Sequence, residues 1–234
     1  MSSPCFVVIE GIDRCGKSGQ AARLVARLRS RGIPADEAAS PDYSSPVGEV
    51  ISRHLSGDLC LMTGSPGTAF KSRSDPLAFE CLQVCDKYVT SARIGRKMAA
   101  GTSVVCARWW QSALLYGQDD GIDPNLILDA ISSLLRPDLS VLLDVDPARI
   151  SKRCNRHNRY ERDLAKQQRL ADLYRELWRK EADGPAAGEH RRGWVVVPGD
   201  AGEDEVADRV WREVLVMRPD LVEHAELEDL TAKI

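Results

Sequence analysis

The stretch Val7–Gly19, with the sequence VVIEGIDRCGKSG, decides the fold of this chain. Within it, Gly11–Ser18 matches the motif GxxxxGK followed by Ser or Thr in full. The motif follows an apolar, β-branched run and precedes a segment with helical periodicity. Glycines let backbone N–H groups point at phosphate oxygens, and the start of a helix adds the positive end of its dipole. The stretch therefore predicts a site for a nucleoside triphosphate, although the motif does not say whether water or a second substrate receives the phosphoryl group.

Individual residues of this loop have distinct expected roles. Lys17 can reach the β- and γ-phosphates, and the Ser18 hydroxyl can bind Mg²⁺. Arg14 can place its guanidinium on the transferring group, like an arginine finger supplied in cis, or it can form a surface salt bridge. The residues predicted to bind ATP in the loop are Gly11, Asp13, Arg14, Cys15, Gly16, Lys17, Ser18 and Gly19.

The composition is that of a globular protein, and we expect one domain over residues 1–234. The net charge of −3 provides no basic field that would favour nucleic acid or a membrane surface. No apolar run is long enough to span a bilayer, and the N-terminus lacks the pattern of a signal peptide. The seven cysteines are scattered and odd in number, which favours reduced thiols and a cytoplasmic location.

Apolar strands alternate with amphipathic helices, which predicts a parallel sheet with helices on both faces. Strands are expected at residues 6–10, 102–109, 138–146 and 194–200. Helices are expected at residues 20–31, 47–55, 77–100, 125–135, 164–180 and 204–216, with a break near Gly95 as an alternative. The stretch at about 56–76 is rich in Gly, Ser and Pro, so it is expected to be a long functional loop.

Three later stretches follow the phosphate loop in a specific order. They are RWWQSALLY from Arg108, RPDLSVLLDVDP from Arg136 and RHNRYE from Arg156. Together with EGIDRCGKS they resemble the thymidylate kinase family, over about Phe6 to Val210. The resemblance implies a three-layer α/β/α P-loop fold with a five-stranded parallel sheet and a helical lid at about 149–163. It also implies transfer of the γ-phosphoryl group of ATP to dTMP with Mg²⁺, and a homodimer as the common assembly.

The resemblance also assigns roles to residues outside the loop. Asp13 would face the acceptor sugar, and Arg108 would hold the acceptor phosphate and act in catalysis with Lys17 and Arg14. Arg153 would lie near the adenine; its spacing from Arg149 and Arg156 also suits a triphosphate, or else a solvated basic helix face. The residues implied for the acceptor nucleotide are Asp13, Tyr43, Gln83, Lys87, Arg108, Ser112, Tyr116 and Tyr160.

The chain departs from the family pattern on the acceptor and metal side. Ala107 stands where the family has a strand-end Asp, and Gln83 stands where a Phe stacks on thymine. Lys87 and Tyr43 each replace an arginine. For the metal we therefore expect Ser18 with Glu10 as the nearest carboxylate, and Asp144 at the end of the apolar run VLLD is an alternative. Two further functions remain open: a kinase for another or modified pyrimidine deoxynucleotide, and a nucleotide-binding protein without turnover.

Overall fold

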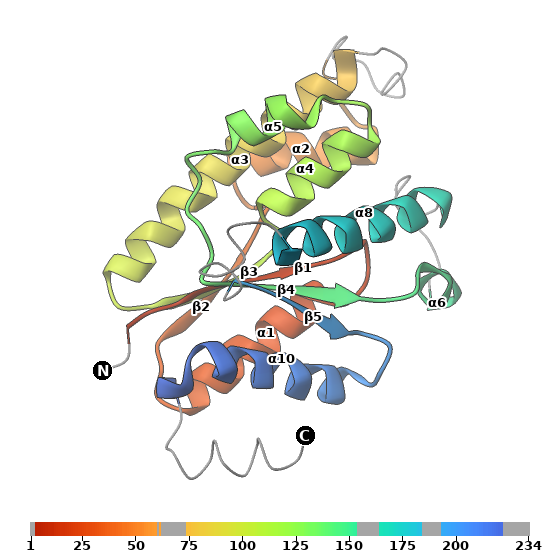
Figure 1. Ribbon diagram of the computed structural model, residues 1–234. Coiled ribbons are helices and arrows are strands. Elements are labelled where there is room, and N and C mark those ends of the chain that lie inside the picture. Colours follow the sequence, from red (N-terminus) through yellow and green to blue (C-terminus); the bar gives the residue numbers. More distant parts are fainter. Residues whose placement is uncertain (1–2, 60, 62–73, 154–163, 184–192, 222–234) are drawn as a thin grey trace.

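The computed structural model describes residues 3–59, 61, 74–153, 164–183 and 193–221, and it shows a parallel five-stranded sheet between two layers of helices (Figure 1). The strands lie in the order β2-β3-β1-β4-β5, and every neighbouring pair is parallel. Their bounds are β1 Phe6–Glu10, β2 Ala35–Ala39, β3 Ser103–Ala107, β4 Leu139–Asp144 and β5 Trp194–Pro198. This architecture confirms the predicted three-layer α/β/α fold.

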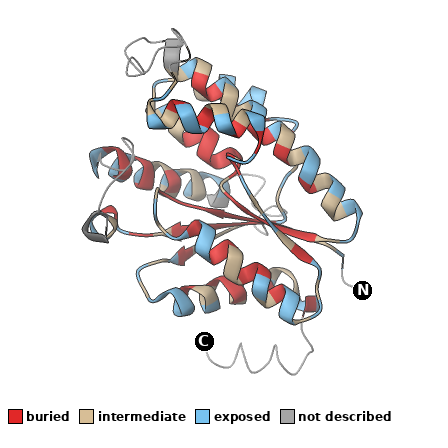
Figure 2. Ribbon diagram, turned by 180° about the vertical axis from the view of Figure 1, so that it is seen from behind, coloured by how far each residue is buried: buried red, intermediate tan, exposed pale blue. Residues whose placement is uncertain are grey.

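The helices divide between the two faces of the sheet. Helices α1 (Lys17–Ser30) and α10 (Glu203–Met217) cover one face, and α3 (Ser74–Ala99), α4 (Trp110–Asp119), α5 (Pro124–Ala130) and α8 (Leu164–Asp183) lie over the other (Figure 1). Helix α2 (Pro46–Ser56) packs on α3, and α6 (Pro147–Arg153) follows β4. A short 3₁₀ turn, Pro219–Leu221, ends the described chain. The central strands β1, β3 and β4 and the inward faces of these helices are buried, whereas most residues of the edge strands β2 and β5 are partly buried or exposed (Figure 2). No helix in the described ranges is long and apolar enough to cross a membrane.

The edge strand β2 was not predicted from its residues. Its sequence ADEAA contains no β-branched or aromatic residue, so propensity does not favour a strand there. Within the described ranges it pairs only with β3, from Ala35 opposite Ser103 to Ala39 opposite Ala107. The pairing partner, rather than the local sequence, thus makes this segment a strand.

Three expectations for the helices need correction. Helix α3 runs without a break past Gly95, and it already begins at Ser74, so the last part of the expected loop at 56–76 is helical. Helix α5 ends at Ala130 rather than at residue 135, and the Ser132 hydroxyl donates to the Asp129 carbonyl oxygen just after its end. Helix α4 was not predicted. Most of the remaining loop lies outside the described residues.

The topology places the phosphate loop at a crevice. The chain leaves the central strand β1 through α1 towards β2 and β3, and later builds β4 and β5 on the other side of β1. The carboxyl end of β1 is therefore close to the point where the strand order reverses. Open parallel sheets bind their ligands outside the strand ends at such a point.

Candidate active site

The phosphate loop between β1 and α1 depends on glycine at two positions. Gly11 and Gly16 have φ angles of 139° and 99°, in the region that side chains rarely adopt. A Cβ atom on Gly11 would come within 2.8 Å of both the Cys15 Sγ and the Leu143 carbonyl oxygen. The loop therefore keeps its conformation only with glycine at this position.

Lys17, the first residue of α1, is folded back over this loop. Its side chain is buried, and Nζ donates to the Ile12 carbonyl oxygen at 2.5 Å. Burial, and then the nearby Arg108 guanidinium, lower the pKa of Lys17. An anion bound at the loop would oppose both effects, because it favours the charged form of the lysine. The position therefore suits a phosphate.

Arg108 lies directly after β3 and forms the centre of the site. Its φ angle is 68°, which is uncommon for a residue other than glycine, and its backbone N–H donates to the Ile9 carbonyl oxygen at 3.0 Å. The guanidinium forms an ion pair with Asp13 and donates to the Ser112 Oγ at 3.3 Å and the Tyr116 hydroxyl at 3.2 Å. Backbone strain of this kind is concentrated at binding and catalytic sites.

Asp13 connects the phosphate loop to α8. Gln167 donates from Nε2 to the Asp13 carboxylate at 2.9 Å, and its Oε1 accepts from the Asp13 backbone N–H at 3.0 Å. Burial by itself would raise the pKa of Asp13, but the Arg108 and Lys17 charges and the hydrogen bond from Gln167 hold that pKa below its ordinary value. Asp13 is therefore held as a carboxylate that faces the cavity.

Glu10, at the end of β1, is completely buried among groups from the start of α4 and from α8. Its carboxylate accepts from the Trp109 backbone N–H at 2.6 Å, the Ser112 Oγ at 2.8 Å and the Tyr174 hydroxyl at 2.9 Å. These bonds tie β1 to the start of α4 and to α8. They occupy both oxygens, so the structural role of Glu10 is clear, and its metal role stays a prediction.

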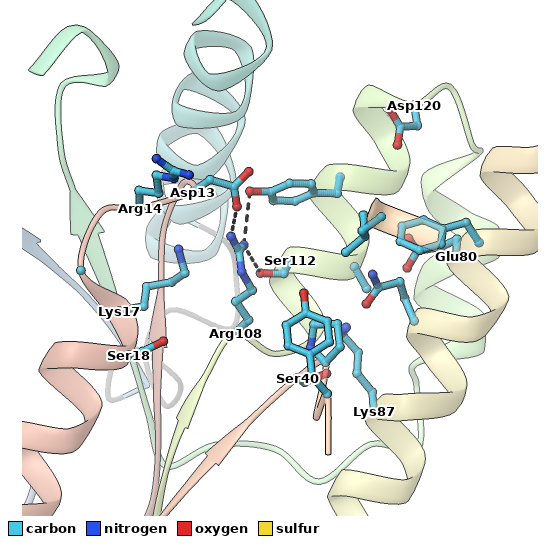
Figure 3. Close-up of a pocket in the computed structure, with 18 of the residues that line it drawn as sticks. Asp13, Arg14, Lys17, Ser18, Ser40, Glu80, Lys87, Arg108, Ser112 and Asp120 are labelled. Atoms are coloured by element: carbon cyan, nitrogen blue, oxygen red, sulfur yellow. Dashed lines mark hydrogen bonds and ion pairs between the residues drawn. The ribbon is translucent and has the colours of Figure 1, made fainter. Parts of the chain in front are cut away.

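A cavity of about 400 Å³ opens between the phosphate loop and helices α3 and α4 (Figure 3). The structure brings to it every described residue that the sequence implied for the acceptor: Asp13, Tyr43, Gln83, Lys87, Arg108, Ser112 and Tyr116. Five residues of the loop line it as well, namely Arg14, Gly16, Lys17, Ser18 and Gly19, in addition to Asp13. Tyr160 lies outside the described residues, as does the side chain of Arg153.

Tyr43 reaches the rim of this cavity because α3 holds the segment before it. Asp86 accepts from the Ser40 Oγ at 2.8 Å and from the Asp42 backbone N–H at 3.0 Å. Arg93, two helical turns after Asp86 on α3, forms an ion pair with Asp42. Arg93 lines the second cavity and not the one that Tyr43 lines.

The second cavity, of about 360 Å³, lies beside the metal side of the loop. Ser18, Ala107, Glu37 and Asp42 all line it. Asp144, the alternative metal carboxylate, is held by Arg175 instead, with Nη2 at 2.7 Å from Oδ1. Within the described residues no group of three or more His, Cys, Asp or Glu side chains could hold a metal ion. Ser18 is exposed at the mouth of the cavity, which fits a metal bound mainly through phosphate oxygens and water.

The cavity also has residues that sequence reasoning missed. Phe79 and Glu80 of α3 line it, and Gln167 of α8 binds Asp13. A signal existed for Gln167, because it is a polar residue on the stripe that contains Ala171 and Tyr174, both of which are buried. Phe79 precedes Gln83 by one helical turn, so an aromatic residue on the same face was visible in the sequence.

Comparisons with known proteins show which family this chain resembles in sequence and fold. A family model described as thymidylate kinase matches residues 9–185. The thymidylate kinase of Solidesulfovibrio magneticus is 32% identical over 222 residues, covering 88% of this chain and 96% of that protein. The thymidylate kinase of Arabidopsis thaliana is 27% identical over 211 residues, covering 90% of this chain and 70% of that protein. The structure of thymidylate kinase from Candida albicans is similar in fold, with a TM-score of 0.71 at 23% identity, covering 95% of this chain and 96% of that one.

Proposed function

Because this chain belongs to the thymidylate kinase family, we propose that it transfers the γ-phosphoryl group of ATP to dTMP, giving ADP and dTDP. The observation that carries the proposal is the single cavity that joins a complete phosphate loop to Arg108. Lys17 and Arg108 lie on either side of the space where a donor and an acceptor phosphate would meet (Figure 3).

The reaction in this cavity is an in-line attack of an acceptor phosphate oxygen on the γ-phosphorus. That oxygen is already anionic, so no side chain has to act as a general base. Lys17 binds the β- and γ-phosphates of ATP, and Arg108 holds and orients the acceptor phosphate. Arg14 lies at the loop beside the cavity, where its guanidinium can stabilise charge on the transferring group.

The carboxylate of Asp13 has two roles in this proposal. It holds the guanidinium of Arg108 in place, and it offers an acceptor to the hydroxyl group of the acceptor sugar. Ser112 and Tyr116 hold the same guanidinium from α4, so three partners orient one arginine. Orientation of this kind contributes to rate because the reacting groups are already aligned when the substrates bind.

Ser18 is the residue that would hold Mg²⁺, since its hydroxyl is exposed at the loop and lines both cavities. Mg²⁺ held there would supply positive charge that offsets part of the negative charge of the phosphates. Ala107 supplies no carboxylate to orient the metal's water, and the carboxylates that line the second cavity together with Ser18 are Asp42 and Glu37. Arg153 and Tyr160 complete the proposal as lid residues, by resemblance to the family.

ADP formation with ATP, Mg²⁺ and one monophosphate at a time tests the proposal. We expect turnover with dTMP, less with dUMP and dCMP, and little ATP hydrolysis without an acceptor. The control is Lys17→Ala, whose loss of a charge that stabilises the transition state should reduce kcat by roughly 10²–10³-fold, with unchanged circular dichroism. Nucleotide binding without turnover would instead support a binding protein, and turnover that excludes dTMP would show a different acceptor.

A further inference from the structure

The base end of the acceptor cavity carries a buried carboxyl group that neither the sequence motifs nor the proposed reaction uses. Glu80 lines the cavity from α3 and is only 6% exposed. Among the described residues, no donor lies within hydrogen-bond distance of its Oε1, which is fully enclosed. A buried polar group without a partner costs free energy, so it is usually retained for a ligand or a reaction.

Glu80 belongs to a row of three polar side chains on one face of α3. Gln83 and Lys87 follow at i+3 and i+7, and all three line the cavity. Glu80 and Lys87 project from α3 on the side of the cavity away from the phosphate loop (Figure 3). Because Lys17 and Arg108 take the phosphates at the other side, the row on α3 is where the base of the acceptor nucleotide would lie. Phe79, which stacks against His54 with ring centroids 4.8 Å apart, provides an aromatic wall beside the row.

The surroundings of Glu80 favour the neutral acid. Burial raises the pKa of Glu80 to about 8; Lys87 opposes this increase and Asp120 adds to it. The neighbouring helices also carry titratable groups, namely Tyr116 and Asp119 on α4 and Glu49, Arg53 and His54 on α2. Asp120 is itself paired with Lys166, and no ion pair joins Glu80 to Lys87 among the described residues. A carboxyl that is neutral at pH 7 donates a hydrogen bond, whereas an ionised one only accepts.

The three side chains then present donor, acceptor and donor in order along α3. The Glu80 hydroxyl donates, the Gln83 amide accepts when its oxygen faces the cavity, and the Lys87 nitrogen donates whether or not it is charged. Thymine and uracil present the complementary acceptor, donor and acceptor through O4, N3–H and O2. Cytosine presents a donor, an acceptor and an acceptor, so its amino group would meet the Glu80 hydroxyl donor to donor.

We propose that Glu80 is a specificity residue which, as a neutral acid, donates a hydrogen bond to a carbonyl oxygen of the acceptor base and thereby selects 2,4-diketo pyrimidine nucleotides over cytosine nucleotides. The inference rests on the proposed function, and it assigns to hydrogen bonding on α3 the base selection that the family pattern would give to an aromatic residue at Gln83. Ionisation of Glu80 removes the donor and provides an acceptor for an amino group. Selection for dTMP over dCMP therefore weakens as the pH rises through the pKa of Glu80.

The test is the ratio of kcat/KM for dTMP to that for dCMP between about pH 7 and about pH 9. If dCMP is not turned over, its inhibition constant against dTMP replaces its kcat/KM. We expect the ratio in the wild type to fall about tenfold across this range, roughly the loss of one hydrogen bond. Because both rates are measured at the same pH, the ratio cancels the effects on rate of groups that titrate in the same way with either acceptor, such as Lys17 and the phosphates.

Three variants make the test specific. Glu80→Gln keeps a hydrogen-bond donor that does not titrate, so the dTMP/dCMP ratio of kcat/KM should stay high at every pH in this range. Glu80→Ala should lower kcat/KM for dTMP about tenfold and leave KM for ATP unchanged. Glu49→Gln, an exposed glutamate on α2, is the matched control and should behave like the wild type.

The outcomes separate this inference from the proposed function. If dTMP is phosphorylated but the dTMP/dCMP ratio of kcat/KM does not change with pH in the wild type, the role of Glu80 is overturned and the proposed function stands. The same holds if that ratio in Glu80→Ala equals the ratio in the wild type. If dTMP binds without being phosphorylated, the proposed function fails, and the pH dependence of the dTMP dissociation constant by calorimetry decides the role of Glu80. No dTMP binding at all overturns both.

Discussion

At the scale of single residues, the site is a set of buried charges whose partners come from different segments of the chain. Asp13 from the phosphate loop meets Arg108 from the end of β3, and α8 supplies Gln167 to the same carboxylate. Removing one member leaves the other buried without its counter-charge, which costs more than the pair contributes. Functional effects at these residues therefore have to be measured together with stability.

Arg108→Ala should affect the acceptor and not the donor. The variant loses the guanidinium that binds the acceptor phosphate, so KM for dTMP should rise at least tenfold while KM for ATP changes by less than about threefold. The melting temperature should also fall, because Asp13 loses its partner. Steady-state kinetics with each substrate varied in turn check this. A larger increase in KM for ATP than for dTMP would place the acceptor phosphate elsewhere.

Ala107→Asp tests the metal side of the site. Ala107 and Ser18 line the same cavity, so an aspartate there could orient the water of a metal held by Ser18. Losing one such partner typically costs about 10–100-fold in metal affinity or activity, so restoring it should lower the Mg²⁺ concentration for half-maximal rate or raise kcat. The measurement is rate against Mg²⁺ concentration, together with Mn²⁺ binding to the ATP complex followed by calorimetry. An unchanged midpoint and kcat, with weaker dTMP binding, would mean that Ala107 makes room for the acceptor.

Glu80→Gln should stabilise the free protein, and more so at high pH. The pKa of Glu80 is about 8 in the fold against 4.5 for an ordinary glutamate, so folding takes up a proton between these values. The contribution of Glu80 to stability thus falls as the pH rises from about 4.5 to about 8 and is constant above. The increase in the free energy of unfolding caused by Glu80→Gln should grow by a few kcal/mol between about pH 4.5 and about pH 8. The upper limit of this growth is about 1.4 kcal/mol per pH unit. Urea unfolding at the low and high ends of this pH range measures the effect, with Glu49→Gln as the control. An equal stabilisation by Glu80→Gln at both pH values would contradict the prediction.

At the scale of elements, the acceptor side depends on how closely α2 packs against the segment that carries Tyr43. Gly48 is buried in the first turn of α2, whose start is capped by the Ser45 hydroxyl, which accepts from the Gly48 N–H at 3.0 Å. A Cβ atom on Gly48 would lie 1.9 Å from the Asp42 carbonyl oxygen. Backbone atoms cannot yield as a side-chain tip can, so the segment would have to move.

Gly48→Ala should therefore destabilise the protein by about 2 kcal/mol or more and raise KM for dTMP, because overpacking displaces the backbone next to Tyr43. The matched control is Gly95→Ala in α3, where a Cβ atom would meet nothing within 4 Å. That substitution should stabilise the protein by about 0.5–1 kcal/mol through helix propensity. Urea unfolding of the two variants tests the expected destabilisation by Gly48→Ala and the expected stabilisation by Gly95→Ala. Equal effects of the two substitutions would show that the close contact at Gly48 relaxes easily.

At the scale of the whole molecule, the sheet joins two apolar cores that share its strands. Val7 and Ile9 of β1 belong to the core under α1 and α10, while Phe6 and Val8 belong to the core under α4 and α8. Successive residues of a strand face opposite sides, so neither core can lose its packing without exposing a strand of the other. This coupling supports the prediction of a single domain.

We expect one cooperative unfolding transition with the same midpoint by every probe. Trp211 lies in the core on the α10 face, and Trp109 and Trp110 lie in the core on the other face. Tryptophan fluorescence of Trp211→Phe should therefore report mainly the unfolding of the core under α4 and α8. Far-ultraviolet circular dichroism reports the helices and strands of both layers. Coincident transitions in urea would support one domain. Separate midpoints would show that the two layers unfold independently.

The sequence by itself determined the nucleotide loop and most of what surrounds it. A motif with a set spacing can be recognised without coordinates, because Gly11, Gly16 and Lys17 act through local backbone geometry and the first turn of one helix. The residues that the resemblance implied for the acceptor on α3 and α4, namely Gln83, Lys87, Ser112 and Tyr116, all line the cavity. Their binding of the acceptor stays a prediction.

Only the tertiary structure decided the features that depend on a partner far along the chain. The segment ADEAA is a strand because it pairs with β3, Gln167 reaches Asp13 across more than 150 residues, and the raised pKa of Glu80 follows from its burial. The enclosure of Glu10 by Trp109, Ser112 and Tyr174 is of the same kind. Strand pairing, buried hydrogen bonds and shifts of pKa are set by distances between segments, and these distances exist only after the chain has folded.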